Sequence, residues 1–118
     1  MLFRFREFPV YKTARLFRTL VYKTSAGFPK TEIYALSDQI RRAANSILLN
    51  LAEGSNRNSD KDFSRYLTIA LGSLEEVVAC LDIALDEKYL SDDQHASLMN
   101  EAEQIAKQIV GFRHSMKS

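Results

Sequence analysis

Residues 39–54 read QIRRAANSILLNLAEG and carry two lines of side chains at helical spacing. Positions three and four apart lie on one side of an α-helix. The apolar line consists of Ile40, Ala43, Ile47 and Leu51. Beside it runs a polar line of Gln39, Arg42, Ser46, Asn50 and Glu53. The pattern predicts an amphipathic helix whose core-facing stripe is bordered by groups that need partners.

The polar line has a structural and a functional interpretation. In the first, Arg42, Asn50 and Glu53 form a buried or half-buried network, joined by Glu76 from a later helix. Buried polar groups can fix the register of otherwise similar helix packings, so this interpretation is favoured. In the second, the same groups line a binding cleft. Arg41 belongs to neither line and is predicted to be the member most free to face solvent or a ligand.

The length of 118 residues fits a single domain spanning residues 1–118. Only four glycines and two prolines are present, which favours helices over the many turns of an all-β domain. No apolar run approaches the length of a membrane span, and the first residues lack a signal-peptide pattern. A soluble, cytoplasmic protein with no membrane partner is therefore expected.

Three further helices are predicted around residues 39–54. The first runs from about Val10 to Ser25. The second is the helix that contains residues 39–54; it is capped by Ser37 and ends at Gly54, which is predicted to be in a left-handed conformation. The third begins at Ser59, and the fourth at a Ser91/Gln94 capping box. Short links imply an all-α, antiparallel up-down-up-down four-helix bundle.

The third predicted helix is unusually apolar. Its main line is Phe63, Leu67, Ala70, Leu74, Val77, Leu81 and Ala84, and a second line is Leu71, Val78 and Leu85. So wide an arc predicts a central position in the core or burial by another subunit. Gly72 interrupts this helix, and because glycine costs about 1 kcal/mol relative to alanine, a close approach of neighbouring atoms is expected there.

The net charge of +1 hides an uneven distribution. Residues 1–30 carry seven basic side chains and one acidic, whereas residues 59–90 carry three basic and seven acidic. The bases of the first helix fall away from its apolar side. Either the two regions attract each other within the fold, or the basic one binds nucleic acid or an acidic partner. The residues predicted to contact nucleic acid are Lys12, Arg15, Lys23, Arg41, Arg57 and Arg65.

The sequence offers no catalytic constellation. His95 and His114 are about 30 Å apart on one helix and cannot share a metal within one chain. Cys80 has no histidine near it in sequence and sits beside the apolar arc. There is no glycine-rich phosphate loop. No enzymatic activity, cofactor or metal is expected.

The string QIRRA, followed by Ser46-Ile47, Asn50-Leu51-Ala52-Glu53-Gly54 and Gly72-Ser73-Leu74, resembles a known family. These are the four-helix-bundle proteins encoded in intervening sequences of bacterial large-subunit ribosomal RNA genes. Further matches cover nearly the whole chain: Phe28-Pro29-Lys30, Glu32, Tyr34, Leu36, Arg57, Phe63, Leu67, Glu76 and Tyr89-Leu90. The chain departs from the family at Tyr11, Leu48 and Leu71, where tryptophan, proline and arginine are usual. Leu71 removes a cation beside Gly72, which puts any family role of that charge in doubt here.

The resemblance implies an antiparallel bundle that assembles into a ring-like homopentamer. A similar branch, the accessory proteins of diversity-generating retroelements, binds a reverse transcriptase and nucleic acid through basic surfaces. Two functional hypotheses follow. The first is a non-enzymatic, oligomeric protein that binds RNA or DNA through basic patches. The alternative is a protein-interaction scaffold or an accessory subunit for a nucleic-acid enzyme.

Overall fold

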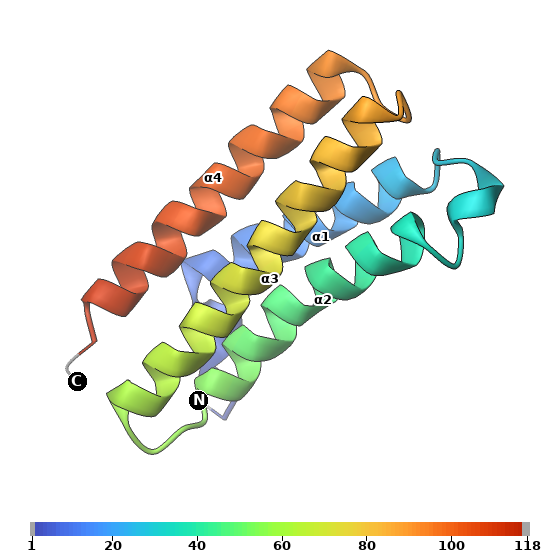
Figure 1. The fold of residues 1–118 in the computed structure, drawn as a ribbon. Coiled ribbons are helices and arrows are strands. Elements are labelled where there is room, and N and C mark those ends of the chain that lie inside the picture. Colours follow the sequence, from blue (N-terminus) through green and yellow to red (C-terminus); the bar gives the residue numbers. More distant parts are fainter. Residues whose placement is uncertain (1, 117–118) are drawn as a thin grey trace.

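The computed structural model describes residues 2–116, which form four α-helices joined by short connections (Figure 1). The helices are α1 (Pro9–Ser25), α2 (Leu36–Gly54), α3 (Asp60–Asp86) and α4 (Asp92–His114). Single turns of 3-10 helix cover Arg4–Glu7 and Lys30–Glu32. Each helix packs against its two neighbours, with α4 returning to α1 and the most extensive contact between α2 and α3. The predicted antiparallel four-helix bundle is confirmed.

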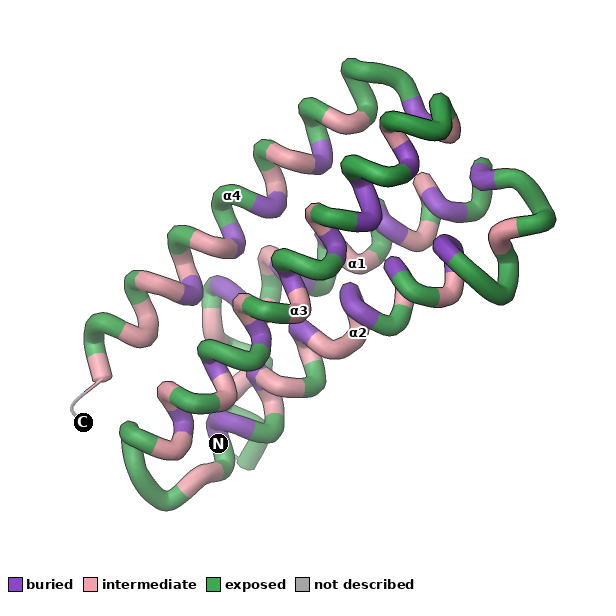
Figure 2. Tube along the Cα trace, viewed as in Figure 1, coloured by how far each residue is buried: buried purple, intermediate pink, exposed green. Residues whose placement is uncertain are grey.

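The core consists of the helix faces that the apolar spacing predicted. On α2 the four apolar-line residues are at most 4% exposed, and on α3 the seven main-line residues are at most 3% exposed. Figure 2 shows the buried stretches of the helices turned toward the middle of the bundle. The second α3 line, Leu71, Val78 and Leu85, is only half-buried. One chain therefore does not cover the whole apolar arc of α3.

Two of the predicted caps are confirmed, and one is wrong. The Ser59 hydroxyl accepts a hydrogen bond from the Asp62 amide at 3.1 Å, and Ser91 with Gln94 forms the full capping box of α4. By contrast, α2 begins one residue before Ser37, whose side chain is buried and caps nothing. A carboxylate oxygen of Glu32 instead accepts from the Leu36 amide at 3.3 Å.

Gly54 does not adopt the predicted left-handed conformation, because none of the described glycines has a positive φ. It is the last, buried residue of α2, and α3 passes directly against it. A Cβ atom at this position would lie 2.6 Å from the Cβ of Tyr66 and 3.0 Å from Cδ1 of Phe63. The glycine is therefore required by the close approach of α2 and α3 at this end of the bundle.

At Gly72 the structure lacks the close approach that the sequence predicted. Apart from the adjoining residues and backbone of its own helix, no described atom lies within 4 Å of a Cβ at this position. The residue is exposed on α3. The chain itself therefore gives no packing reason for this glycine.

Candidate nucleic-acid interface

The exposed side of α1 carries cations that the bundle leaves largely unneutralised. Lys12, Arg15 and Lys23 are all exposed. Lys12 lies 3.3 Å from Glu7, which offsets part of its charge. Within residues 2–116, no acidic side chain pairs with Arg15 or Lys23. This face keeps the positive charge that a polyanion would attract.

A half-buried cluster around Tyr22 joins α1 to α2. The guanidinium carbon of Arg18 lies 4.0 Å from the centroid of the Tyr22 ring, and that of Arg41 lies 4.8 Å from it. Asn45 ties the group together, since its amide donates to the Tyr22 hydroxyl at 2.9 Å and its carbonyl accepts from Arg18 Nε at 2.6 Å. Arg41 Nε donates to the Ser25 hydroxyl at 2.8 Å. These bonds hold two cations in fixed positions at the helix seam.

Arg41 is therefore less free than predicted. Besides its bond to Ser25, its Nη2 donates to the Tyr22 backbone carbonyl at 3.2 Å, and the side chain is part-buried. The reason is its place on α2, which turns the residue toward α1 instead of toward solvent. Its predicted contact with nucleic acid stays a prediction.

The predicted contacts Arg57 and Arg65 lie where α2 ends and α3 begins. Both guanidinium groups lie over the ring of Tyr66, at 4.8 and 5.0 Å from its centroid. Arg57 pairs with Glu53 at 3.2 Å and Arg65 with Asp62 at 2.8 Å. The hydrogen bond to Asp62 and the charge of that carboxylate raise the pKa of Arg65 above its ordinary value. Each of these two arginines has an acidic neighbour three or four residues away in sequence.

The four residues predicted to share a structural network do not join one another in the described chain. Arg42 is exposed and pairs with Asp38 one turn away, at 2.8 Å. Glu53 pairs with Arg57, and Glu76 is exposed with no hydrogen bond or ion pair recorded for residues 2–116. Within the described chain these three side chains are all exposed and do not meet one another.

Asn50 is the one predicted network residue that supports an inter-helix bond. Its amide donates to the backbone carbonyl and the hydroxyl of Ser46, at 2.8 and 3.1 Å. The Ser46 hydroxyl in turn lies 2.8 Å from that of Ser73 on α3. A pair of serines thus forms a polar link between α2 and α3.

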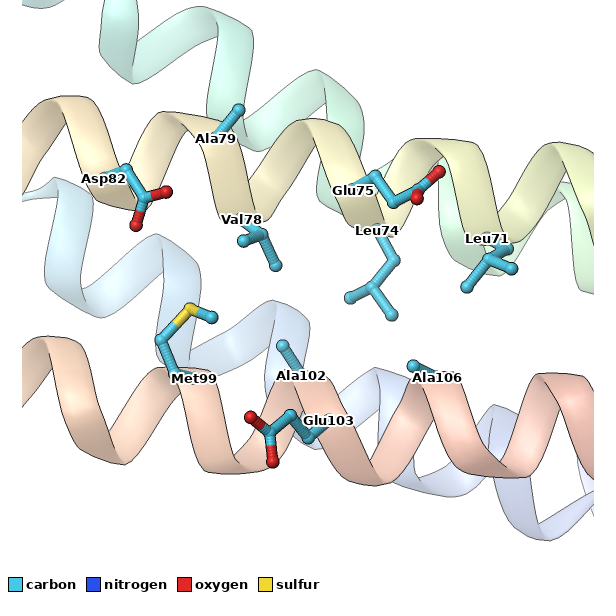
Figure 3. A pocket seen from close by; sticks show the side chains of 10 residues that line it. All are labelled: Leu71, Leu74, Glu75, Val78, Ala79, Asp82, Met99, Ala102, Glu103 and Ala106. Atoms are coloured by element: carbon cyan, nitrogen blue, oxygen red, sulfur yellow. The ribbon is translucent and has the colours of Figure 1, made fainter.

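A groove of about 410 Å³ lies between α3 and α4 (Figure 3). Leu71, Leu74 and Val78 point from α3 toward α4, where Met99, Ala102 and Ala106 face them. Glu75, Asp82 and Glu103 also line it. Carboxylates at an apolar groove repel phosphate, so this side of the bundle is the least suited to nucleic acid.

Metal-ligating and nucleophilic side chains provide no further candidate site in the described part of the chain. In the described part of the chain, no three His, Cys, Asp or Glu side chains come together in a way that could hold a metal ion. Cys80 is 2% exposed, and burial, with a smaller effect of the Glu76 charge, raises the pKa of its thiol. A thiol with a raised pKa is a poor nucleophile at neutral pH.

Four members of the Tyr22 cluster were not among the predicted site residues: Arg18, Tyr22, Ser25 and Asn45. A signal was present, because Arg18 and Tyr22 are four residues apart and so are Arg41 and Asn45. Their meeting across two helices depends on the rotation of α1 against α2, which local spacing does not give.

Residues 6–111 match the sequence model of the 23S rRNA-intervening sequence proteins. The chain belongs to the 23S rRNA-intervening sequence protein family. A crystal structure of a protein of unknown function from the S23 ribosomal protein family of Bacteroides thetaiotaomicron VPI-5482 has the same fold. It is 25% identical, with a TM-score of 0.79, over 90% of this chain and 99% of the other. No curated relative matches the chain.

The family takes its name from the intervening sequences of 23S rRNA. Among residues 2–116 of this family member, no helix is both long enough and apolar enough to cross a membrane.

Proposed function

We propose that this intervening-sequence family protein is a non-enzymatic, oligomeric RNA-binding protein that contacts phosphates through its α1–α2 face. Four cations of this face, which have no acidic partner within residues 2–116, carry the proposal: Arg15 and Lys23 on the surface, Arg18 and Arg41 at the seam. Phosphate contacts supply most of the affinity of nonspecific nucleic-acid binding. The family's connection with ribosomal RNA supports RNA as the polyanion.

Self-association is part of the proposal. The half-buried second line of α3 and exposed side chains such as Leu16 and Leu49 leave apolar surface for a second copy to cover. The family resemblance implies a homopentamer. A ring would repeat each basic face, so weak contacts by separate protomers to one RNA would add to its overall affinity.

A salt titration of RNA binding tests the proposal. Because bound phosphates release counterions, log K should fall linearly with log salt concentration, with a slope of about −0.7 per phosphate for single strands. Three or more contacts would give a slope of about −2 or steeper. Fluorescence anisotropy with a labelled RNA measures it. No binding at about 20 mM salt, or a flat dependence, would rule the function out.

A matched pair of variants locates the effect. Arg15→Gln with Lys23→Gln removes two exposed charges from α1, while Lys88→Gln with Lys107→Gln removes two exposed charges elsewhere. Both variants have the same net charge. The α1 variant should bind RNA more weakly and with a shallower salt slope than the control. Equal losses would indicate attraction by net charge alone.

A protein-interaction role is the second candidate, and the groove between α3 and α4 favours it. Its apolar floor and acidic lining suit a basic, amphipathic segment of a protein, such as a helix of a nucleic-acid enzyme. In this role the chain would be an accessory subunit that binds a reverse transcriptase through the groove. Capture of such a partner should survive charge reversal at Arg57 and Arg65, and its loss would count against this role.

A further inference from the structure

Tyr22 and Tyr66 each lie beneath two guanidinium groups, which makes the two clusters directly comparable. At Tyr22 the guanidinium carbons of Arg18 and Arg41 are 4.0 and 4.8 Å from the ring centroid. At Tyr66 those of Arg57 and Arg65 are 4.8 and 5.0 Å away. Aromatic rings attract cations through their quadrupole. The stacking contacts are therefore alike at the two sites.

The clusters differ in their neutralising charge. At Tyr66, the carboxylates of Glu53 and Asp62 lie 3.2 and 2.8 Å from the two arginines. At Tyr22, the recorded acceptors are neutral: the Asn45 side-chain carbonyl, the Ser25 hydroxyl and the Tyr22 backbone carbonyl. No ion pair among residues 2–116 includes Arg18 or Arg41. Two like charges thus share one part-buried ring without a counterion from the described chain.

Donors also remain available at the Tyr22 cluster. Arg18 uses only Nε in a recorded hydrogen bond, so both of its Nη groups are unengaged within the described residues. Arg41 uses Nε and Nη2, which leaves Nη1. A guanidinium group presents its donors in a planar fork that matches the oxygens of a phosphate. Because Asn45 and Ser25 already fix the two side chains, little further conformational entropy is lost on binding.

We propose that the Tyr22 cluster binds a phosphodiester group of the RNA backbone, an inference that rests on the proposed function. Arg15 lies three residues before Arg18 on α1 and is therefore its neighbour on the helix surface. Because positive charge continues beside the cluster on α1, the site suits a polymer with several phosphates better than a single anion. The cluster is the fixed site, and the exposed cations contact adjacent phosphates.

The test compares two double variants in the full-length protein. Arg18→Gln with Arg41→Gln removes both arginines of the Tyr22 cluster, and Arg57→Gln with Arg65→Gln removes both arginines of the Tyr66 cluster. Each removes two positive charges and two arginine–tyrosine contacts. The first should weaken RNA binding about tenfold or more and make the salt slope shallower by about 0.7 to 0.9. The second should stay within about twofold of the unaltered protein, since the carboxylates of Glu53 and Asp62 offset the positive charge of its two arginines.

Equal losses in the two variants, or no loss in the Tyr22 variant, would overturn the proposal. A second measurement uses the unaltered protein and does not depend on variant folding or on RNA. Titration with dimethyl phosphate, against chloride at equal ionic strength, should shift the NMR signals of the Arg18 and Arg41 Nε–H groups but not those of Arg57 and Arg65.

The two measurements separate failure of the site from failure of the function. If dimethyl phosphate shifts Arg18 and Arg41 but no RNA binds, the phosphodiester site stands and the RNA-binding function fails. If RNA binds but neither signal responds, the function stands and this site is refuted. Competition by poly-glutamate as strong as that by RNA would assign the cluster to an acidic protein instead, against the proposal.

Discussion

Alanine in place of Gly54 is expected to lower the free energy of unfolding by roughly 1–3 kcal/mol, although alanine is the better helix former. The new methyl group would lie 2.6 Å from the Cβ of Tyr66 and 3.0 Å from a ring carbon of Phe63. A Cβ atom moves only with its backbone, so relief requires α2 and α3 to separate. Urea denaturation followed by circular dichroism measures the change.

The same substitution at Gly72 is the matched control. Outside the adjoining residues and backbone of its own helix, no described atom lies within 4 Å of the added methyl group, and the residue is exposed in the middle of α3. Gly72→Ala should therefore raise the free energy of unfolding by up to about 1 kcal/mol. Opposite signs at the two glycines are expected. A stabilising effect at Gly54 would show that α2 and α3 do not approach as closely as described.

Phe63→Ala is expected to lower the free energy of unfolding by about 3–5 kcal/mol. Phe63 is 3% exposed and forms a ring cluster with Phe8 and Phe112, at centroid distances of 6.0 and 5.3 Å. Arg4 lies over the same ring at 5.6 Å, and it donates to the backbone carbonyl of Ser55 at 2.9 Å. The substitution removes the centre of this end of the bundle, which the N-terminal turn covers.

Tyr34→Ala provides the comparison for Phe63, because this ring is 95% exposed. Its free energy of unfolding should stay within about 0.5 kcal/mol of the unaltered protein. Thermal and urea denaturation of both variants give the difference. A loss below about 1 kcal/mol at Phe63 would mean that the ring cluster is not packed as described.

The helices could be predicted from sequence because their signals are local. The four-three spacing from Phe63 to Ala84 predicted a buried face, and the structure buries every residue of that line. Ser59, Ser91 and Gln94 act as caps through bonds to residues within one turn. Such features need no knowledge of what lies across the bundle.

The C-terminal end of α2, where the local rule failed, depends on neighbours more distant in sequence. Gly54 was assigned the left-handed conformation, but it stays helical because α3 needs the space. The left-handed residue is instead Lys88, with φ of 61°, where the Tyr89 amide donates to the Ala84 carbonyl and closes α3. Glycine or asparagine is usual at a left-handed position after a helix, so the lysine gave no sequence signal for this conformation.

The candidate site was predicted only in part for the same reason. The exposed cations of α1 follow from its helical periodicity. The acidic partners of Arg57 and Arg65 also lie three or four residues away, a spacing that the sequence displays. The meeting of Arg18 with Arg41 over Tyr22 could not be predicted, since it depends on how two helices are rotated against each other.

Light scattering of the protein with and without a short structured RNA is the most direct test of an oligomeric RNA-binding protein. Alone, the protein should have a mass several times the 13.5 kDa of one chain, five times it if the family resemblance holds. RNA at low salt should add its own mass to the particle, and high salt should remove it. A 13.5 kDa particle that RNA leaves unchanged would contradict both the assembly and the proposed function.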